Sequence, residues 1–203
     1  MSDFVSRGFG GRRRVDPELA ARVPPGQYVE TDFPVLTAGP TPRVDPEEWA
    51  LTIDGMVAAP RTWSAAEFRA LEFEDIPCDI HCVTKWSKLG TSFRGVSLDV
   101  LLEAVEPLAA YAMVHSYGGY TTNLSIEDLS DTKAWIVTEH EGEPLEAEHG
   151  GPARLLVPHL YFWKSAKWVS GLRIMDHDEP GFWEANGYHT RGDPWKEERY
   201  WND

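Results

Sequence analysis

A cysteine at the end of a predicted strand is the residue of this sequence best suited to chemistry. Cys82 lies in the stretch DIHCVTKWS (79–87), where an apolar run gives way to polar residues. Such a position exposes a thiolate, which is both a nucleophile and a soft metal ligand. Taken alone, a cysteine beside a histidine and a lysine is more often a buried, inert thiol. A zinc site would need a fourth ligand and normally a second paired element, which the sequence does not show.

A second stretch combines glycines with basic side chains. Residues 149–167 read HGGPARLLVPHLYFWKSAK. Glycines let a ligand approach the backbone closely, and Arg154 and Lys164 supply positive charge and hydrogen-bond donors for a phosphate. Each piece alone is typical of a turn that enters an ordinary strand. Together, an imidazole, a guanidinium and an ammonium in an acidic chain indicate a site for an anionic ligand.

Composition and charge exclude several classes of partner. The 203-residue chain has 19 Lys and Arg against 33 Asp and Glu, a formal net charge of −14. This charge repels nucleic acids and anionic lipids, so we expect neither a nucleic acid nor a membrane as partner. No segment approaches the roughly 18 to 20 apolar residues that cross a bilayer. With 42% hydrophobic residues, the length predicts one domain with irregular ends.

The cysteines and the first residues indicate a cytoplasmic protein. Four positions of a strand span about 13 Å, too far for Cys78 and Cys82 to form a disulfide. We therefore expect two free thiols, as in a reducing compartment. Arg12-Arg13-Arg14 resembles the start of a twin-arginine signal, but the Val15-Asp16-Pro17-Glu18 run that follows is not an apolar segment.

The order of predicted elements favours an α+β fold with mixed β-sheet layers and short helices. Residues 1–48 are rich in Gly, Pro and charge, which predicts an extended N-terminal arm. The pattern Ser64-Ala65-Ala66-Glu67 predicts a capping box that begins a short helix, and the periodicity of Ser97 to Val105 predicts another. Strands are predicted over 49–55, 76–83, 111–116, 134–138, 154–157 and 168–175, and residues 84–95 form a polar stretch between elements. Strands therefore outnumber helices.

Four segments, in this order, resemble the molybdopterin-binding domain of the sulfite oxidase superfamily. They are 33–37 (FPVLT), 81–87 (HCVTKWS), 149–167 and 183–188 (WEANGY). They are similar to the family's first pterin-contacting segment, to the metal-ligand loop of its methionine sulfoxide reductase branch, to its pyranopterin-phosphate motif and to its active-site tyrosine segment. The resemblance implies an arm over 1–32, a molybdopterin-binding oxidoreductase domain over 33–203, and a two-electron reaction at a molybdenum–molybdopterin cofactor.

The resemblance implies a role for particular side chains. Cys82 would bind molybdenum as a thiolate, and Tyr188 would line the substrate mouth. His149, Arg154 and Lys164 would hold the pterin phosphate. Further cofactor contacts would come from Phe33, Val35, Leu36, Thr37, Ser116, Phe162 and Trp163.

Two departures from the sulfite oxidases indicate the substrate. Those enzymes place a sulfite-binding arginine five positions after the ligand cysteine, where this chain has Ser87, as in the methionine sulfoxide reductase branch. Leu36 or Thr37 stands in place of a second arginine. The sequence therefore favours reduction of a small neutral S-oxide or N-oxide, with the Ser87 hydroxyl as a catalytic contact, over the alternative of sulfite oxidation.

Two other classes of function stay open at this point. A non-catalytic molybdopterin carrier would keep the cysteine and the phosphate-binding residues without turnover. A thiol-dependent enzyme would use Cys82 as a nucleophile, assisted by His81 or Lys85. An oxidoreductase would need a separate redox partner, such as a ferredoxin, a flavoprotein or a cytochrome, because the chain carries no motif for a second redox group.

Overall fold

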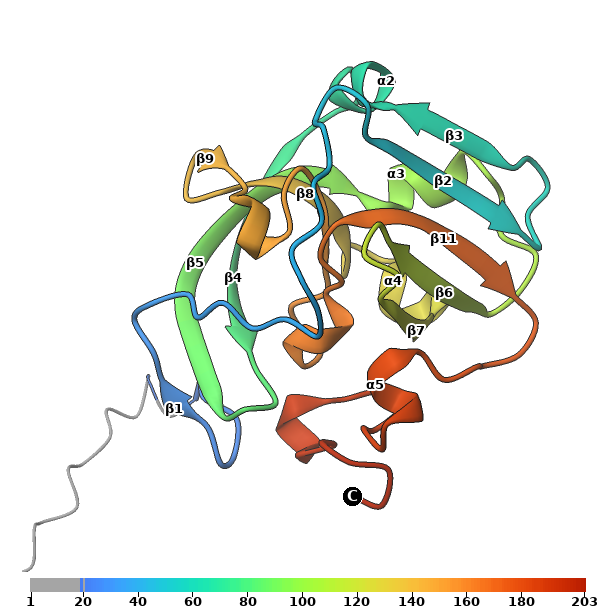
Figure 1. Ribbon diagram of the computed structural model, residues 1–203. Helices are drawn as coiled ribbons and strands as arrows, with labels where there is room; N and C mark the ends of the chain where they lie inside the picture. The colour runs from blue at the N-terminus through green and yellow to red at the C-terminus, as the bar shows by residue number, and fades with distance from the viewer. Residues whose placement is uncertain (1–18, 20) are drawn as a thin grey trace, which may run out of the picture.

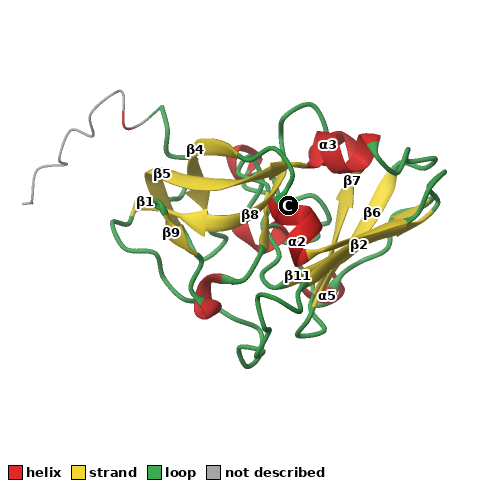
Figure 2. Ribbon diagram, turned by 90° about the horizontal axis from the view of Figure 1, so that it is seen from above, coloured by secondary structure: helices red, strands yellow, loops and turns green. Residues whose placement is uncertain are grey.

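Two β-sheets and short helices make up the part of the chain that this computed structural model describes, residue 19 and residues 21–203. Figure 1 shows the two sheets beside each other, and Figure 2 shows the short helices around them. Residues 1–18 and 20 of the predicted arm lie outside the described residues, so the boundary between arm and domain stays a prediction. The mixed sheets with short helices confirm the α+β class.

The first sheet is organised around one long strand. Its path is β1-β5-β8-β10, with β4 paired to β5 and β9 paired to β8. The strands are β1 (Tyr28–Val29), β4 (Glu74–His81), β5 (Trp86–Ser97), β8 (Trp135–His140), β9 (Glu143–Pro144) and β10 (Arg154–Leu156). Both β4 and β8 run antiparallel to β5. The tight connection between β4 and β5 therefore holds Cys82 at one end of this sheet.

The second sheet has the order β3-β2-β11-β6-β7. Its strands are β2 (Ala50–Gly55), β3 (Arg61–Ser64), β6 (Tyr111–Ser116), β7 (Thr121–Ser125) and β11 (Val169–Met175). Strand β11 runs parallel to β2 and antiparallel to β6. The stretch that carries the basic residues therefore connects β10 of the first sheet to β11 of the second.

The helices are short, and α2, α3 and α4 begin at side-chain caps. They are α2 (Ala65–Arg69), α3 (Leu98–Glu103), α4 (Ile126–Leu129) and α5 (Phe182–Ala185), with 3₁₀ turns η1 (Ala147–His149), η2 (Phe162–Lys164) and η3 (Pro194–Lys196). The predicted capping box is confirmed, because the Ser64 amide donates to Glu67 Oε2 at 2.9 Å and the Glu67 amide donates to Ser64 Oγ. In the described part of the chain, no helix has the length and apolar character needed to cross a bilayer.

Two apolar cores hold the sheets together. The larger one takes residues from both sheets, among them Leu51 of β2, Val96 of β5 and Leu172 of β11. The smaller one gathers Cys82 with apolar side chains of β4 and β5, and Phe33 packs against it. The smaller core therefore supports the wall of the site that contains the cysteine.

The polar stretch of residues 84–95 differs from the expectation of an irregular connection. Most of it belongs to β5, which begins at Trp86. The segment is polar in sequence, but its backbone pairs with β4 from Ser87 to Gly95 and with β8 from Phe93 onward. Such pairing is a tertiary property that local composition does not reveal. The strands β6, β8, β10 and β11 begin and end within two residues of their predicted bounds, whereas β7 was not predicted because its buried face carries Thr122.

Gly95→Ala is expected to lower the free energy of unfolding by about 1 to 3 kcal/mol, because the added methyl overpacks a strand pair. A Cβ at Gly95 would lie 2.2 Å from the carbonyl oxygen of Ile136 and 2.5 Å from the Cα of Val137. Gly39→Ala is the matched control, since nothing lies within 4 Å of its Cβ position. Urea unfolding of both variants measures the difference, and equal stabilities would contradict the packing of β5 against β8.

Candidate active site

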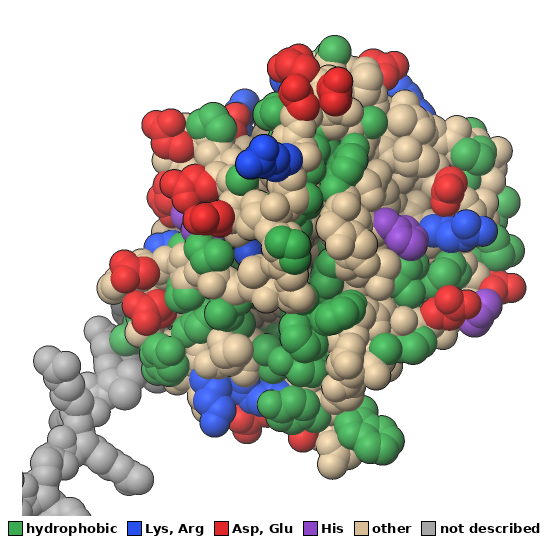
Figure 3. All heavy atoms as spheres, viewed as in Figure 1, with side chains coloured by type: hydrophobic (Ala, Val, Ile, Leu, Met, Phe, Trp, Pro, Cys, Tyr) green, Lys and Arg blue, Asp and Glu red, His purple; other side chains and the backbone are tan. Residues whose placement is uncertain are grey.

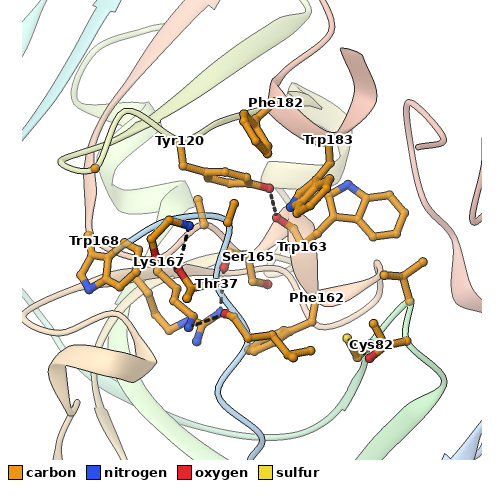
Figure 4. A pocket seen from close by; sticks show the side chains of 18 of the residues that line it. Thr37, Cys82, Tyr120, Phe162, Trp163, Ser165, Lys167, Trp168, Phe182 and Trp183 are labelled. Carbon is orange, nitrogen blue, oxygen red and sulfur yellow. Dashed lines mark hydrogen bonds between the residues drawn. The ribbon is translucent and has the colours of Figure 1, made fainter. Parts of the chain in front are cut away.

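A cavity of about 370 Å³ brings together most of the side chains that the sequence singled out. It is bounded by the segment 33–40, the turn after β4, the stretch between β10 and β11, and the segment that contains α5. The predicted site residues that line it are Phe33, Leu36, Thr37, Cys82, Arg154, Phe162, Trp163 and Tyr188. Figure 4 shows Lys167 and Trp168 at one side of this cavity and Cys82 at the opposite side.

Cys82 lies in the turn that connects β4 to β5. The Cys82 amide donates to the carbonyl of Trp86 at 2.8 Å, and the Lys85 amide donates back to the carbonyl of Cys82 at 3.0 Å. Lys85 closes the turn with a φ of 79°. The Cys82 side chain is 7% exposed, and its Sγ lies 3.1 Å from the Thr84 hydroxyl. Burial raises the pKa of the Cys82 thiol, and the Thr84 hydroxyl and the nearby Arg199 guanidinium oppose this rise.

Residues from both ends of the described chain brace this turn. The Gln27 side-chain amide donates to the carbonyls of Cys82 and Trp86, at 3.0 and 3.2 Å. Arg199 donates to the carbonyl of Val83 at 2.7 Å and to Gln27 Oε1 at 3.2 Å. Gln27 thus adds a second donor to two carbonyls that the turn's own amides already pair, and Arg199 pairs the Val83 carbonyl, so these bonds hold the turn in place.

Two basic side chains form the other end of the cavity. Arg154 is fully buried, and its two terminal nitrogens donate to the carbonyls of His149 and Ser165, each at 2.7 Å. Its Nε atom is buried and has no hydrogen-bond partner. Lys167 donates to the carbonyls of Leu36 at 2.7 Å and Glu148 at 2.6 Å, which leaves one of its three donors free. Among the described residues, neither cation forms an ion pair with a carboxylate.

The pKa values at this end reflect uncompensated positive charge. Burial lowers the pKa of Arg154 to about 9, so the guanidinium is still charged at pH 7. Burial, with repulsion from Arg154, lowers the pKa of Lys167 to about 8. An anion bound between these two groups would raise both pKa values.

Aromatic rings surround the Arg154 guanidinium. The Phe162 ring lies 4.1 Å from its central carbon. Phe33 lies behind it and stacks on the His149 imidazole at 4.0 Å. His149 does not line the cavity itself, and its Nδ1 is buried without a partner. Phe33 and His149 therefore belong to the same wall, although only Phe33 faces the cavity.

Lys164 does not lie where the sequence analysis expected it, and this expectation is corrected. Its side chain is fully buried, and its ammonium forms an ion pair with Glu184 at 2.7 Å. It also donates to both oxygens of Asn123 and to the carbonyl of Thr190. With all its donors used, Lys164 has none for a phosphate. The spacing of two lysines three residues apart does not reveal which one faces the cavity; the structure places Lys167 there.

Ser87 is the second correction. Its hydroxyl is fully buried and bonds to His81 Nδ1 at 2.8 Å, and it does not line the cavity. The alternation of side chains along β5 turns Ser87 away from the face that Trp86 presents to the cavity. The Ser87 hydroxyl therefore does not face the cavity, and the buried His81 imidazole is engaged with that hydroxyl.

The remaining predicted contacts lie near the cavity without facing it. Ser116 ends β6, and its buried hydroxyl has no partner. The turn that follows it, which includes Gly118 and Gly119, lines the cavity instead. Val35 is exposed beside two lining neighbours. The described residues contain no group of three His, Cys, Asp or Glu side chains that could hold a metal.

A group of aromatic side chains forms a further edge of the cavity. Figure 4 shows Tyr120, Phe182 and Trp183 along one edge, opposite Phe162. The Tyr120 hydroxyl donates to the carbonyl of Trp163 at 2.7 Å. The sequence analysis assigned no role to Tyr120 or Phe182, because they come from separate elements that only the fold brings together.

Lys164→Met is expected to lower the free energy of unfolding by about 3 to 5 kcal/mol, because it leaves the Glu184 carboxylate buried without its counter-charge. The double variant Lys164→Met/Glu184→Gln should recover part of this loss, whereas Lys196→Met, at an exposed lysine, should have little effect. Urea unfolding measures all three. A single variant of normal stability that has lost its cofactor would instead support the original assignment of Lys164.

Comparisons with known proteins agree with this geometry. The family described as an oxidoreductase molybdopterin binding domain matches residues 38–183. An uncharacterized oxidoreductase of Bacillus subtilis, YuiH, is 44% identical over 195 residues, which cover 95% of this chain and 98% of that protein. A putative protein-methionine-sulfoxide reductase subunit of Azospira oryzae, YedZ1, is 25% identical over 182 residues, which cover 87% of this chain and 69% of that protein.

A solved structure shares the fold. The sulfane dehydrogenase SoxCD from Paracoccus pantotrophus superposes with a TM-score of 0.61 at 21% identity, over 87% of this chain and 57% of that one. The chain therefore belongs to the oxidoreductase molybdopterin-binding domain family of the sulfite oxidase superfamily, and it is an oxidoreductase with a molybdenum–molybdopterin cofactor.

Proposed function

We propose that this protein reduces a small neutral S-oxide or N-oxide, with electrons from a separate redox partner. The observation that carries the proposal is the position of the positive charges in the cavity relative to Cys82. Its two lining cations are Arg154 and Lys167. Lys167 lies at the side opposite Cys82 (Figure 4), and Arg154 lies close enough to Lys167 to lower its pKa. The other side chains that line the cavity carry no charge. A neutral substrate fits such a mouth better than an anion.

The residues present fit a molybdopterin cofactor. The unpaired Nε of buried Arg154 and the free donor of Lys167 suit a phosphate, which is dianionic near neutral pH. The rings of Phe33, Phe162 and Trp168 provide apolar faces for a flat pterin. Cys82 supplies a soft sulfur ligand at the far end. When bound, the cofactor supplies a two-electron redox centre that exchanges an oxygen atom with a substrate.

In the proposed reaction the oxide gains two electrons and two protons. Its S–O or N–O bond breaks, and the oxygen leaves as water. The electrons come from a ferredoxin, a flavoprotein or a cytochrome. Tyr188 lines the cavity near Cys82, and burial raises the pKa of its phenol, which keeps it protonated. Its hydroxyl can therefore donate a hydrogen bond to the oxide oxygen and hold the substrate in place.

Sulfite is a poorer substrate for this cavity. A dianion that enters the mouth loses its hydration, and no lining cation at that end replaces it. The Arg199 guanidinium near the turn is engaged with the Val83 carbonyl and Gln27. The chain's net charge of −14 adds a long-range repulsion. Ser87 takes no part in this preference, because it does not line the cavity.

The cellular location is also a proposal. Both cysteines are free, and burial raises the pKa of Cys78 to about 12. Free thiols fit a reducing compartment, so we propose that the protein is cytoplasmic.

Cys82→Ala is expected to remove reduction of dimethyl sulfoxide, assayed with reduced viologen dye, and to lower the molybdenum content while pterin is retained. The reason is that the thiolate binds the metal while separate residues hold the phosphate. Cys78→Ala is the matched control and should keep both activity and metal. Full activity in Cys82→Ala would overturn the mechanism. Molybdenum in the wild-type protein without reduction of any oxide would favour a carrier.

Lys167→Met is expected to weaken cofactor retention by roughly ten- to a hundredfold, the worth of one charged hydrogen bond. Because a bound phosphate favours the ammonium form, wild-type retention should also fall as pH rises through about 8, the pKa of Lys167 in the free protein. Pterin fluorescence after dialysis at pH 7, 8 and 9 measures both effects. A wild-type protein that keeps its pterin equally at all three values would show that Lys167 does not contact the phosphate.

A further inference from the structure

We infer that the substrate carries a flat, uncharged ring next to its oxide group, and that Trp183 and Tyr188 form the wall that receives this ring. The inference rests on the proposed function and narrows it from small oxides in general to aryl S-oxides and heteroaromatic N-oxides.

The wall is a continuous set of rings that includes Tyr188, which lies near Cys82. Trp183 stacks on Tyr188 with ring centres 4.9 Å apart and planes 20° apart. Trp163 meets Tyr188 edge-on at 5.1 Å, and Phe182 meets Trp183 edge-on at 5.0 Å. All four rings line the cavity together with Cys82. A flat ring can stack on or pack against such faces, whereas a methyl group covers little of them.

Buried polar contacts hold this wall rigid. The Trp163 indole nitrogen donates to Glu184 Oε1 at 2.8 Å, and Glu184 pairs with buried Lys164. The Tyr188 amide donates to the carbonyl of Trp183 at 3.0 Å, which fixes the spacing of the stacked pair. Because the rings are already ordered, a substrate that contacts them loses little entropy in organising the site. Lys164 and Glu184 thus act as positioning residues for the wall.

The polar groups at this end fit a single oxide oxygen. The Thr84 hydroxyl is occupied by the Cys82 sulfur. Among the described residues, the Tyr188 hydroxyl has no hydrogen-bond partner in the protein. Trp86, which also lines the cavity, has a buried indole nitrogen without a partner. An oxide oxygen can accept from more than one such donor, and an apolar group next to it leaves no further polar group of the substrate unpaired. A ring fulfils this requirement with the largest contact area.

The surface around the segments that form the cavity is also apolar. Figure 3 shows acidic side chains gathered towards the edges of this face, and hydrophobic side chains in its centre and lower part. The exposed large hydrophobic residues of these segments are Val35, Leu36, Phe182, Tyr200 and Trp201. An uncharged aromatic substrate can therefore approach over a surface that favours it.

The test compares methyl phenyl sulfoxide with dimethyl sulfoxide on the molybdenum-loaded protein. We expect kcat/KM to be roughly tenfold or more higher for the phenyl compound, from stacking and burial of the ring. Equal values for the two would overturn this inference and leave the proposed function intact. If neither sulfoxide is reduced while sulfite is oxidised, the proposed function itself is wrong.

A second readout does not depend on turnover. The ligands are methyl phenyl sulfone and dimethyl sulfone, and calorimetry measures their binding. The absence of sulfoxide product shows that the heat comes from binding and not from turnover. We expect the phenyl sulfone to bind roughly tenfold more tightly, and Trp183→Leu to remove most of this preference. The control Trp195→Leu changes a tryptophan that is 49% exposed and does not line the cavity, so it should keep the preference. If Trp183→Leu does not fold, the wild-type comparison still decides, because equal sulfone affinities contradict the aromatic wall.

Discussion

The buried guanidinium of Arg154 is the constraint on which the arrangement of the cavity depends. A charge removed from water is costly unless an opposite charge or a full set of hydrogen bonds compensates it. Two carbonyls and the face of Phe162 compensate part of this cost, but Nε is unpaired and Lys167 adds a second positive charge. The protein therefore holds positive potential at one end of the cavity, and the most direct compensation is a bound anion.

At the end of the cavity that contains Cys82, the backbone turn is held in place by residues from both ends of the described chain. In the turn after β4, Arg199 pairs the Val83 carbonyl, and Gln27 adds a second donor to the carbonyls of Cys82 and Trp86. The Arg199 guanidinium lies over the Tyr161 ring at 4.9 Å, which ties the C-terminal segment to the stretch between β10 and β11. The position of Cys82 is thus linked to the position of the aromatic wall near Tyr188.

Lys164 and Glu184 illustrate why a charge in a motif is not always a ligand. Both are buried, and their ion pair joins η2 to α5 while Asn123 of β7 and Thr190 accept the remaining donors. Replacing either residue leaves the charge of the other buried without a counter-charge. Losing one partner is therefore costly even where the net contribution of the pair to stability is small. Its consequence for function is geometric, because it orders Trp163 and Trp183 beside the thiol.

The sequence by itself determined the α+β class, the capping box at Ser64, the strand bounds of β6 and the two chemical stretches around Cys82 and Arg154. These follow from local patterns, since periodicity, caps and residue types are written along the chain. Only the tertiary structure decided that β5 is a strand, that Ser87 bonds to His81, and that Lys167 rather than Lys164 faces the cavity. The physical reason is that strand pairing, the face on which a side chain lies and the partner of a buried charge depend on residues distant in sequence, and local composition carries no information about them.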